Sequence, residues 1–139
     1  MELSFLHYLG RADKTPLTGE LITYRETDQG QVFYSAFYKT CILPLAERLA
    51  GEDPQKIKRA CGDLGGACED TNDITAVFSF FPRFPVTVKI WLKDEELTGS
   101  ANILFDSSAN HYMHTEDIAL AGELISRFLI MQFESFQIM

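Results

Sequence analysis

The chain has 139 residues, of which 46% are hydrophobic, and eleven of them are phenylalanine. This composition is typical of one folded domain rather than of a disordered chain, and a domain of this length buries a core without needing disulfides. The net charge is −8, and residues 60–139 carry all of the excess, with twelve acids against four bases. Such a surface repels phosphate backbones and anionic lipids, which argues against nucleic-acid and membrane partners.

The three cysteines, Cys41, Cys61 and Cys68, form no CxxC pair. Their odd number, together with an acidic Glu2 and no basic leader segment, predicts reduced thiols in a cytoplasmic protein. We expect the thiols to pack as small buried hydrophobes, although their pattern assigns no chemistry to them. The longest apolar run is shorter than eighteen residues, so we expect no membrane span.

The chain starts with short elements. Leucines three apart predict a helix over residues 2–9, and residues 21–26 alternate as a strand. Turn-forming residues at 28–30 precede a short segment, 31–34, that we expect to pair back as a second strand.

Two helices follow, near residues 36–50 and 54–64. The first carries an i, i+4 apolar stripe and must kink or restart at Pro44, which has no amide hydrogen. The second begins with Asp53 as its N-cap and proline at its first position. The acidic segment 67–73 then forms a loop.

Alternating apolar residues predict a central three-stranded meander over residues 74–105. If the segments PRFP and KDEELTG are its turns, Phe78 lies opposite Val88, and Val88 lies opposite Ile103. One face of the meander is then continuously apolar and needs helices to cover it. We therefore predict an α+β fold, an antiparallel sheet packed by helices, in a single domain over residues 1–139.

A last helix is expected near residues 116–131. Thr115 is a suitable N-cap, and acids in the first turn suit the helix macrodipole. The tail, residues 128–139, stays strongly apolar. This tail is a candidate surface for a protein partner or for self-association.

Strand direction brings the PRFP turn beside the end of the last strand, so Arg83 lies near a polar loop. We call the resulting group the mixed pole: Arg83, Asp106, His111, His114, Glu116 and Asp117. The candidate ligand site comprises Arg83, Asp106, His111, Thr115, Glu116 and Asp117. The opposite end of the meander collects a purely acidic group, which we call the acidic pole: Glu69, Asp70, Asp73, Asp94, Glu95 and Glu96.

Three interpretations of the mixed pole stay open. Imidazole and carboxylate groups perform acid–base chemistry in pockets. His111, His114 and Glu116 are weak candidates for metal ligands, because their spacing does not match a helical zinc motif. The third interpretation is structural: Asp106 binds backbone amides, and Thr115 is a helix cap. No cofactor is predicted.

The segments FFPRFPV, WLKDEE, ANILFD and HYMHTEDIALAGEL, with LHYL and LTGELITYRE before them, resemble the signature of an uncharacterised family of mostly anaerobic prokaryotic proteins, a domain of unknown function. Some relatives resemble fusions to a four-cysteine iron–sulfur domain of the kind linked to corrinoid proteins, which implies an anaerobic redox or one-carbon setting. This chain has no such cysteine cluster. The resemblance also implies that relatives carry further sequence before LHYL.

The sequence supports two functional hypotheses, and it does not decide whether the protein is an enzyme. The first is a cytoplasmic, non-catalytic interaction or accessory module. It accounts for the missing catalytic motif and the apolar tail. The second is a small-ligand or metal-dependent enzyme with a site near Arg83, Asp106 and His111.

Overall fold

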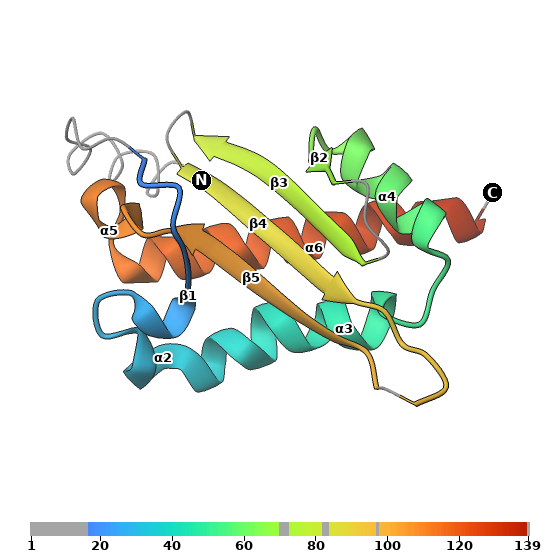
Figure 1. Ribbon diagram of the computed structural model, residues 1–139, viewed down its shortest axis with the longest axis horizontal. Helices are drawn as coiled ribbons and strands as arrows, with labels where there is room; N and C mark the ends of the chain where they lie inside the picture. The colour runs from blue at the N-terminus through green and yellow to red at the C-terminus, as the bar shows by residue number, and fades with distance from the viewer. Residues whose placement is uncertain (1–16, 70–72, 82–83, 97, 139) are drawn as a thin grey trace.

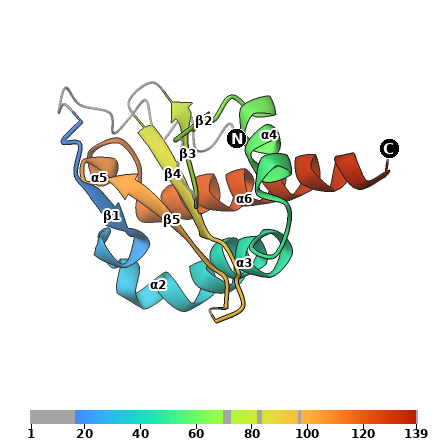
Figure 2. The same cartoon turned by 45° about the vertical axis from the view of Figure 1, so that its right-hand side comes forward.

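The computed structural model describes residues 17–69, 73–81, 84–96 and 98–138. A five-stranded antiparallel sheet, in the order β1-β5-β4-β3-β2, has helices packed against one face, and this confirms the predicted α+β class (Figures 1 and 2). The elements are β1 (Leu21–Thr23), η1 (Tyr24–Glu26), α2 (Gly30–Phe37), η2 (Tyr38–Ile42), α3 (Leu43–Leu49), α4 (Pro54–Asp63), β2 (Ala67–Cys68), β3 (Ile74–Phe81), β4 (Phe84–Trp91), β5 (Ser100–Asp106), α5 (Ala109–Tyr112) and α6 (Thr115–Ile138).

The predicted meander is present as β3, β4 and β5. Val88 lies opposite Ile103 as expected, but Phe78 pairs with Val86 rather than with Val88. The strands continue to a Phe81–Phe84 pair, so the connection is shorter than PRFP, and a register shift follows Ser79. A shift of two residues keeps every side chain on its expected face, so the error did not change the predicted core.

Several short segments differ from the prediction. The strand expected over residues 21–26 ends at Thr23, where η1 begins, and the short helix α5 lies within the expected polar loop. Residues 31–34 belong to helix α2 rather than to a strand, because the chain enters the helix through Gln29 in a left-handed conformation, with φ 58°. The expected loop at 67–73 starts with strand β2, which pairs with β3. The expected helix over residues 2–9 lies outside the described residues.

The helix predicted over residues 36–50 divides at Pro44, as expected. A π-helical turn, η2, joins α2 to α3, and Pro44 lies in the first turn of α3. Wider turns of this kind occur where the regular hydrogen-bond ladder is interrupted. Ser126, buried on α6, donates a hydrogen bond of 2.9 Å from its hydroxyl to the carbonyl oxygen of Cys41 in this turn.

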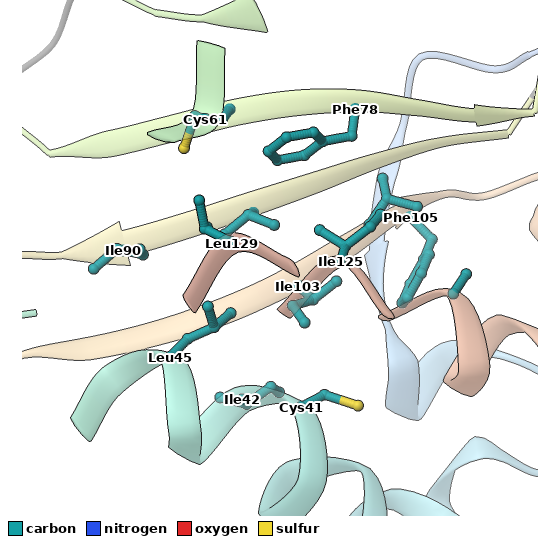
Figure 3. Close-up of a cluster of buried hydrophobic side chains, with 14 of the residues drawn as sticks. Cys41, Ile42, Leu45, Cys61, Phe78, Ile90, Ile103, Phe105, Ile125 and Leu129 are labelled. Carbon is teal, nitrogen blue, oxygen red and sulfur yellow. The ribbon is translucent and has the colours of Figure 1, made fainter. Parts of the chain in front are cut away.

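The core lies between the sheet and the helices α2, α3, α4 and α6. Figure 3 shows side chains from the strands, such as Ile103, meeting Leu45 of α3 and Leu129 of α6. All three are fully buried. No helix of the described residues is long and apolar enough to cross a membrane.

The last helix, α6, is longer than predicted. It begins at Thr115 and ends at Ile138, so it includes most of the apolar tail. Its core-facing stripe is Ile118, Ala121, Ile125, Leu129 and Phe133, all of them buried. The amides of Asp117 and Ile118 both donate to the carbonyl oxygen of His114, so His114 holds the N-cap place that we predicted for Thr115.

Candidate functional site

Asp106 ends β5 and is almost fully buried, with 5% of its surface exposed. Its Oδ1 accepts a hydrogen bond from the Gly19 amide at 2.9 Å. Its Oδ2 accepts from the amides of Thr18 and Ser108, at 3.1 and 3.0 Å, and from both of their hydroxyls. The carboxylate therefore fastens the segment before β1 to the turn after β5, and its oxygens are occupied by the protein itself.

These hydrogen bonds also set the ionisation of Asp106. Burial alone raises the pKa of a carboxyl group, but the Ser108 hydroxyl and the amides of Thr18, Ser108 and Gly19 hold the pKa of Asp106 below its ordinary value. A carboxylate with a lowered pKa is a poor proton acceptor near neutral pH. The environment of Asp106 is that of a structural clamp rather than of a general base.

Thr115 joins a second network at the same end of the sheet. Its hydroxyl donates to the Asp28 carbonyl oxygen at 2.6 Å and accepts from the Asn110 side-chain amide at 3.2 Å. Asn110 in turn accepts from the Asp28 amide at 2.8 Å and donates to the Met113 carbonyl oxygen at 3.2 Å. These bonds attach the loop before α2 to the loop before α6.

The other described residues of the candidate site lie on the two helices that follow β5. His111 is exposed on α5, Glu116 is exposed at the start of α6, and Asp117 is buried there. Arg83 lies outside the described residues. A small hollow of about 200 Å³ is lined by His114 and the first two residues of α6, Thr115 and Glu116, and by a facing set: Asp28, Gln29, Phe33 and Asn110.

Within the part of the chain that the structure describes, no group of three or more His, Cys, Asp or Glu residues is arranged to hold a metal ion. The weak candidates His111, His114 and Glu116 therefore do not form such a group. The described residues of the candidate site offer hydrogen-bonding groups, and their role as a ligand site stays a prediction.

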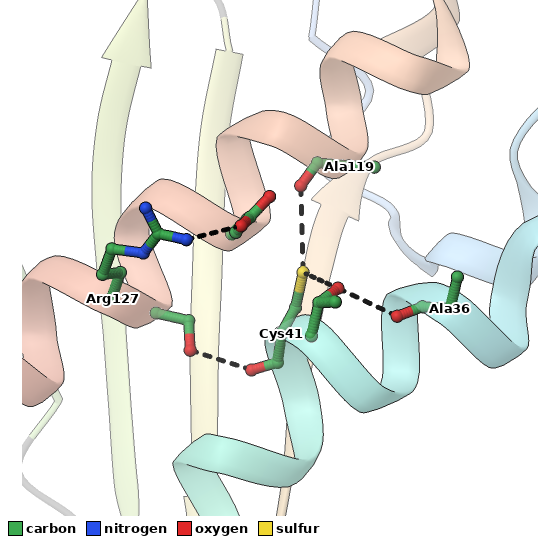
Figure 4. Close-up of polar contacts among 7 residues, drawn as sticks. Ala36, Cys41, Ala119 and Arg127 are labelled. Atoms are coloured by element: carbon green, nitrogen blue, oxygen red, sulfur yellow. Dashed lines mark hydrogen bonds and ion pairs between the residues drawn. The ribbon is translucent and has the colours of Figure 1, made fainter.

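The cysteines are free, and two are buried as expected, whereas Cys68 is exposed. Burial raises the pKa of Cys41 to about 11, and burial together with the neighbouring Cys68 raises the pKa of Cys61 to about 12. Figure 4 shows the Cys41 thiol between helices, 3.8 Å from the carbonyl oxygen of Ala119. Thiols with raised pKa values are poor nucleophiles, so neither buried thiol is suited to catalysis.

Sequence reasoning placed the polar loop correctly but missed Thr18, Ser108 and Asn110, which supply most of its hydrogen bonds. Thr18 lies 88 positions before Asp106 in the chain, and Ser108 donates from both its amide and its hydroxyl. The one available signal was the recurrence of Ser107 and Ser108 directly after a buried strand end, which is typical of side-chain-to-backbone turns.

The fold and this loop define a small α+β protein whose most polar loop is fastened by its own hydrogen bonds. The chain belongs to the family described as a domain of unknown function, DUF3786, whose model matches residues 1–128. No curated protein matches the chain significantly, and no solved structure does so either.

Proposed function

We propose that the protein acts by binding another protein chain, as a non-catalytic interaction or accessory module of the cytoplasm. The observation that carries this proposal is a second apolar row on α6, beside the core-facing stripe and partly exposed. The row, here called the outer row, consists of Leu120, Leu124, Phe128 and Met131, spaced by four, four and three positions. This spacing places all four on one side of a helix.

The second half of the outer row, Phe128 and Met131, is exposed to solvent. Phe128 is 46% exposed and Met131 is 59% exposed, whereas the core-facing stripe of the same helix is buried. A helix on the surface of a monomer normally has one apolar stripe, and a second one marks a contact surface. Methionine and phenylalanine adapt well to partner surfaces, because they bury a large apolar area at a modest cost in order.

The neighbouring helices extend this surface. On α2, Val32 is 75% exposed and Phe33 is 44% exposed. A hollow of about 330 Å³ between α2 and α6 is lined by Phe33 and Leu120, and a second of about 270 Å³ between α3 and α6 is lined by residues that include Met131. Both hollows combine apolar residues with charged ones, Glu123 among them, and a groove of this kind between two helices suits an amphipathic helix.

The non-catalytic part of the proposal is supported by the hydrogen bonds at the mixed pole. Asp106 and Thr115 are already used to join chain segments. The ion pair of Arg127 with Glu123, on the same helix as the outer row, is exposed (Figure 4). Exposed pairs contribute little to stability, so a partner can disturb this one at a small cost.

Light scattering of the purified chain across a concentration series tests the proposal. The proposal is supported if the double variant Phe128→Glu, Met131→Glu no longer associates. The control Gln55→Glu, at an exposed position of α4, should still associate. If the protein is monomeric, the same variants are compared by cross-linking in the extract of an anaerobic host. A monomer whose cross-linked partners are the same in all variants would refute the proposal.

We further propose that the setting is anaerobic redox or one-carbon metabolism. The support is the resemblance of some relatives to fusions with a four-cysteine iron–sulfur domain, together with the free thiols, which suit a reducing compartment. Identification of cross-linked partners by mass spectrometry tests this: partners that carry neither an iron–sulfur nor a corrinoid group would contradict it.

The second candidate is a small-ligand enzyme near Arg83, Asp106 and His111. The hollow beside His114 and Glu116 favours it, although its volume of about 200 Å³ is below the roughly 300 Å³ at which ligand pockets begin. Adding candidate metabolites during NMR measurement of the His114 and Glu116 amides tests it. Absence of concentration-dependent shifts at these amides would remove this candidate.

A further inference from the structure

Strand β5 has an edge that is only half covered. The edge strand β1 pairs with Leu104, Phe105 and Asp106, and then the chain leaves the sheet through the turn η1. Among the described strands, none lies beside residues 100–103 on that side. The first half of β5 is thus an open strand edge, and open edges pair readily with other extended chains.

The direction of the backbone groups on this edge follows from one hydrogen bond. The amide of Ser107 donates to the Glu20 carbonyl oxygen at 2.8 Å, so Ser107 faces the β1 side. Because backbone groups alternate along a strand, Phe105, Ile103 and Ala101 face that side too. The amide of Ile103 indeed donates to the side chain of its own neighbour, Asn102, at 2.9 Å.

A groove runs beside this open edge. It has a volume of about 450 Å³, within the range of roughly 300–1,000 Å³ typical of ligand sites. Its helical wall is formed by η2 and α3 and includes Ile42, Leu43 and Ala46, and its strand wall is formed by Ser100 and Ala101. A strand added beside β5 would direct every second side chain into this apolar space.

The charge around the groove is mainly acidic, which favours a basic partner segment. Glu47 lines the groove, and three exposed acids follow in the next loop, Asp94, Glu95 and Glu96. The Leu92 amide donates to Asp73, which places a further acid here. Lys93 is the basic residue in the groove lining. A second copy of this chain, itself at −8, is repelled by such a surface, whereas a basic segment is attracted.

We propose that an extended, basic segment of a partner protein binds antiparallel to Ala101–Ile103. The segment takes the place beside β5 that β1 does not occupy, and it inserts an apolar side chain between β5 and α3. This surface lies on the opposite side of α3 from the outer row of α6, so the inference does not depend on the function proposed above.

The test uses the full chain and a fluorescein-labelled peptide, Lys-Val-Lys-Leu-Lys-Val-Lys, followed by fluorescence anisotropy. We expect saturable binding, and at least about tenfold weaker binding of the acidic peptide Glu-Val-Glu-Leu-Glu-Val-Glu. Absence of saturable binding by the basic peptide would overturn the proposal. Equal binding of both peptides would also do so.

Backbone methylation distinguishes strand pairing from simple charge attraction. In antiparallel pairing, residues that direct their side chains into the groove also direct their amides toward Ala101 and Ile103. N-methylation of the valines and the leucine therefore weakens binding at least about tenfold, whereas N-methylation of lysines has little effect. The reverse order, or no difference, would contradict antiparallel pairing at this edge.

Two substitutions in the protein locate the peptide. Ala46→Phe fills the groove and should abolish binding, while Asn102→Ala frees the Ile103 amide and should strengthen binding about two- to tenfold. The control Gln55→Glu leaves affinity unchanged, and circular dichroism verifies that each variant is folded. Binding that is insensitive to both substitutions would place the peptide elsewhere and refute the inference, even if the outer row proves functional.

Discussion

The sharpest test of the structural role of Asp106 is its replacement by asparagine, which has nearly the same shape. Both carboxylate oxygens act as acceptors: Oδ1 accepts from Gly19, and Oδ2 accepts from Thr18 and Ser108. An asparagine has one acceptor oxygen and one donor group. Its best orientation keeps the oxygen at the Oδ2 position and turns its NH₂ group toward the Gly19 amide.

The expected loss is about 2–4 kcal/mol in the free energy of unfolding. A hydrogen bond to a charged group is worth roughly 1.5–3 kcal/mol, and the bond from Gly19 is lost outright, with two donors left facing each other. The remaining bonds to Oδ2 lose their ionic character. Since domains are stable by roughly 5–15 kcal/mol, the variant should fold but with a clearly lower midpoint.

The pH dependence gives an independent readout. The pKa of Asp106 is lower in the folded protein than in the unfolded chain. Its contribution to stability is therefore fully present above the unfolded value, near pH 4, and is lost as the pH falls through the lower folded value. The wild-type protein should lose more stability on acidification than Asp106→Asn, so the difference between the two should shrink as the pH falls below about 4.

Urea unfolding followed by circular dichroism, between pH 3 and pH 7, measures both effects. The matched control is Glu52→Gln, which removes an exposed carboxylate and should change stability by less than about 0.5 kcal/mol. A loss below about 1 kcal/mol at pH 7 for Asp106→Asn, or a difference from wild type that does not depend on pH, would show that the described clamp does not stabilise the fold.

Other changes test separate contacts. Ser126→Ala removes the hydroxyl that donates to the Cys41 carbonyl oxygen and should lower stability by about 1–3 kcal/mol in urea unfolding; no loss would mean that this carbonyl is satisfied elsewhere. In the folded protein at pH 7.5, Ellman's reagent should modify Cys68 quickly and the two buried thiols only after unfolding, and three fast thiols would contradict the described burial. Gly30→Ala should destabilise the protein strongly, because a Cβ there would lie 1.9 Å from a carbonyl oxygen of η1. Gly62→Ala in α4, which has open space around it, should instead stabilise the protein by about 0.5–1 kcal/mol. Thermal unfolding compares the two variants, and equal effects would refute the described packing around Gly30.

Much of the sheet could be predicted because alternation fixes the face of each residue. Val88 and Ile103 were paired correctly, and Phe78 was assigned to the right face with the wrong partner. The error arose in the connection, where turn length and a register shift depend on backbone geometry rather than on hydropathy. Helix α2 was missed because the short segment QVFY alternates like a strand, while its packing against distant elements decides its conformation.

The sequence located the polar loop after β5 but did not reveal the partners of its buried carboxylate, Asp106. A cluster of ionisable residues in sequence indicates either chemistry or the fastening of loops, and the distinction depends on donors that have no sequence signature. For Asp106 these donors are mainly backbone amides. Its sequence context would be the same whether its oxygens faced a ligand or the segment at Thr18. Partners of this kind become visible only in three dimensions.

Binding surfaces are harder to find in a sequence than clusters of ionisable residues, because they consist of backbone edges and apolar rows that form no motif. The open edge of β5 follows from local chemistry at the end of β1. There, the Glu26 carboxylate accepts from the Thr23 amide at 3.0 Å and from its hydroxyl at 3.3 Å, in a capping box that turns the chain into η1. Without this turn, residues 24 and 26 would lie opposite Ile103 and Ala101. The same few hydrogen bonds that end β1 thus leave the first half of β5 without a described strand on that side, and this is the edge at which we propose that a partner segment binds.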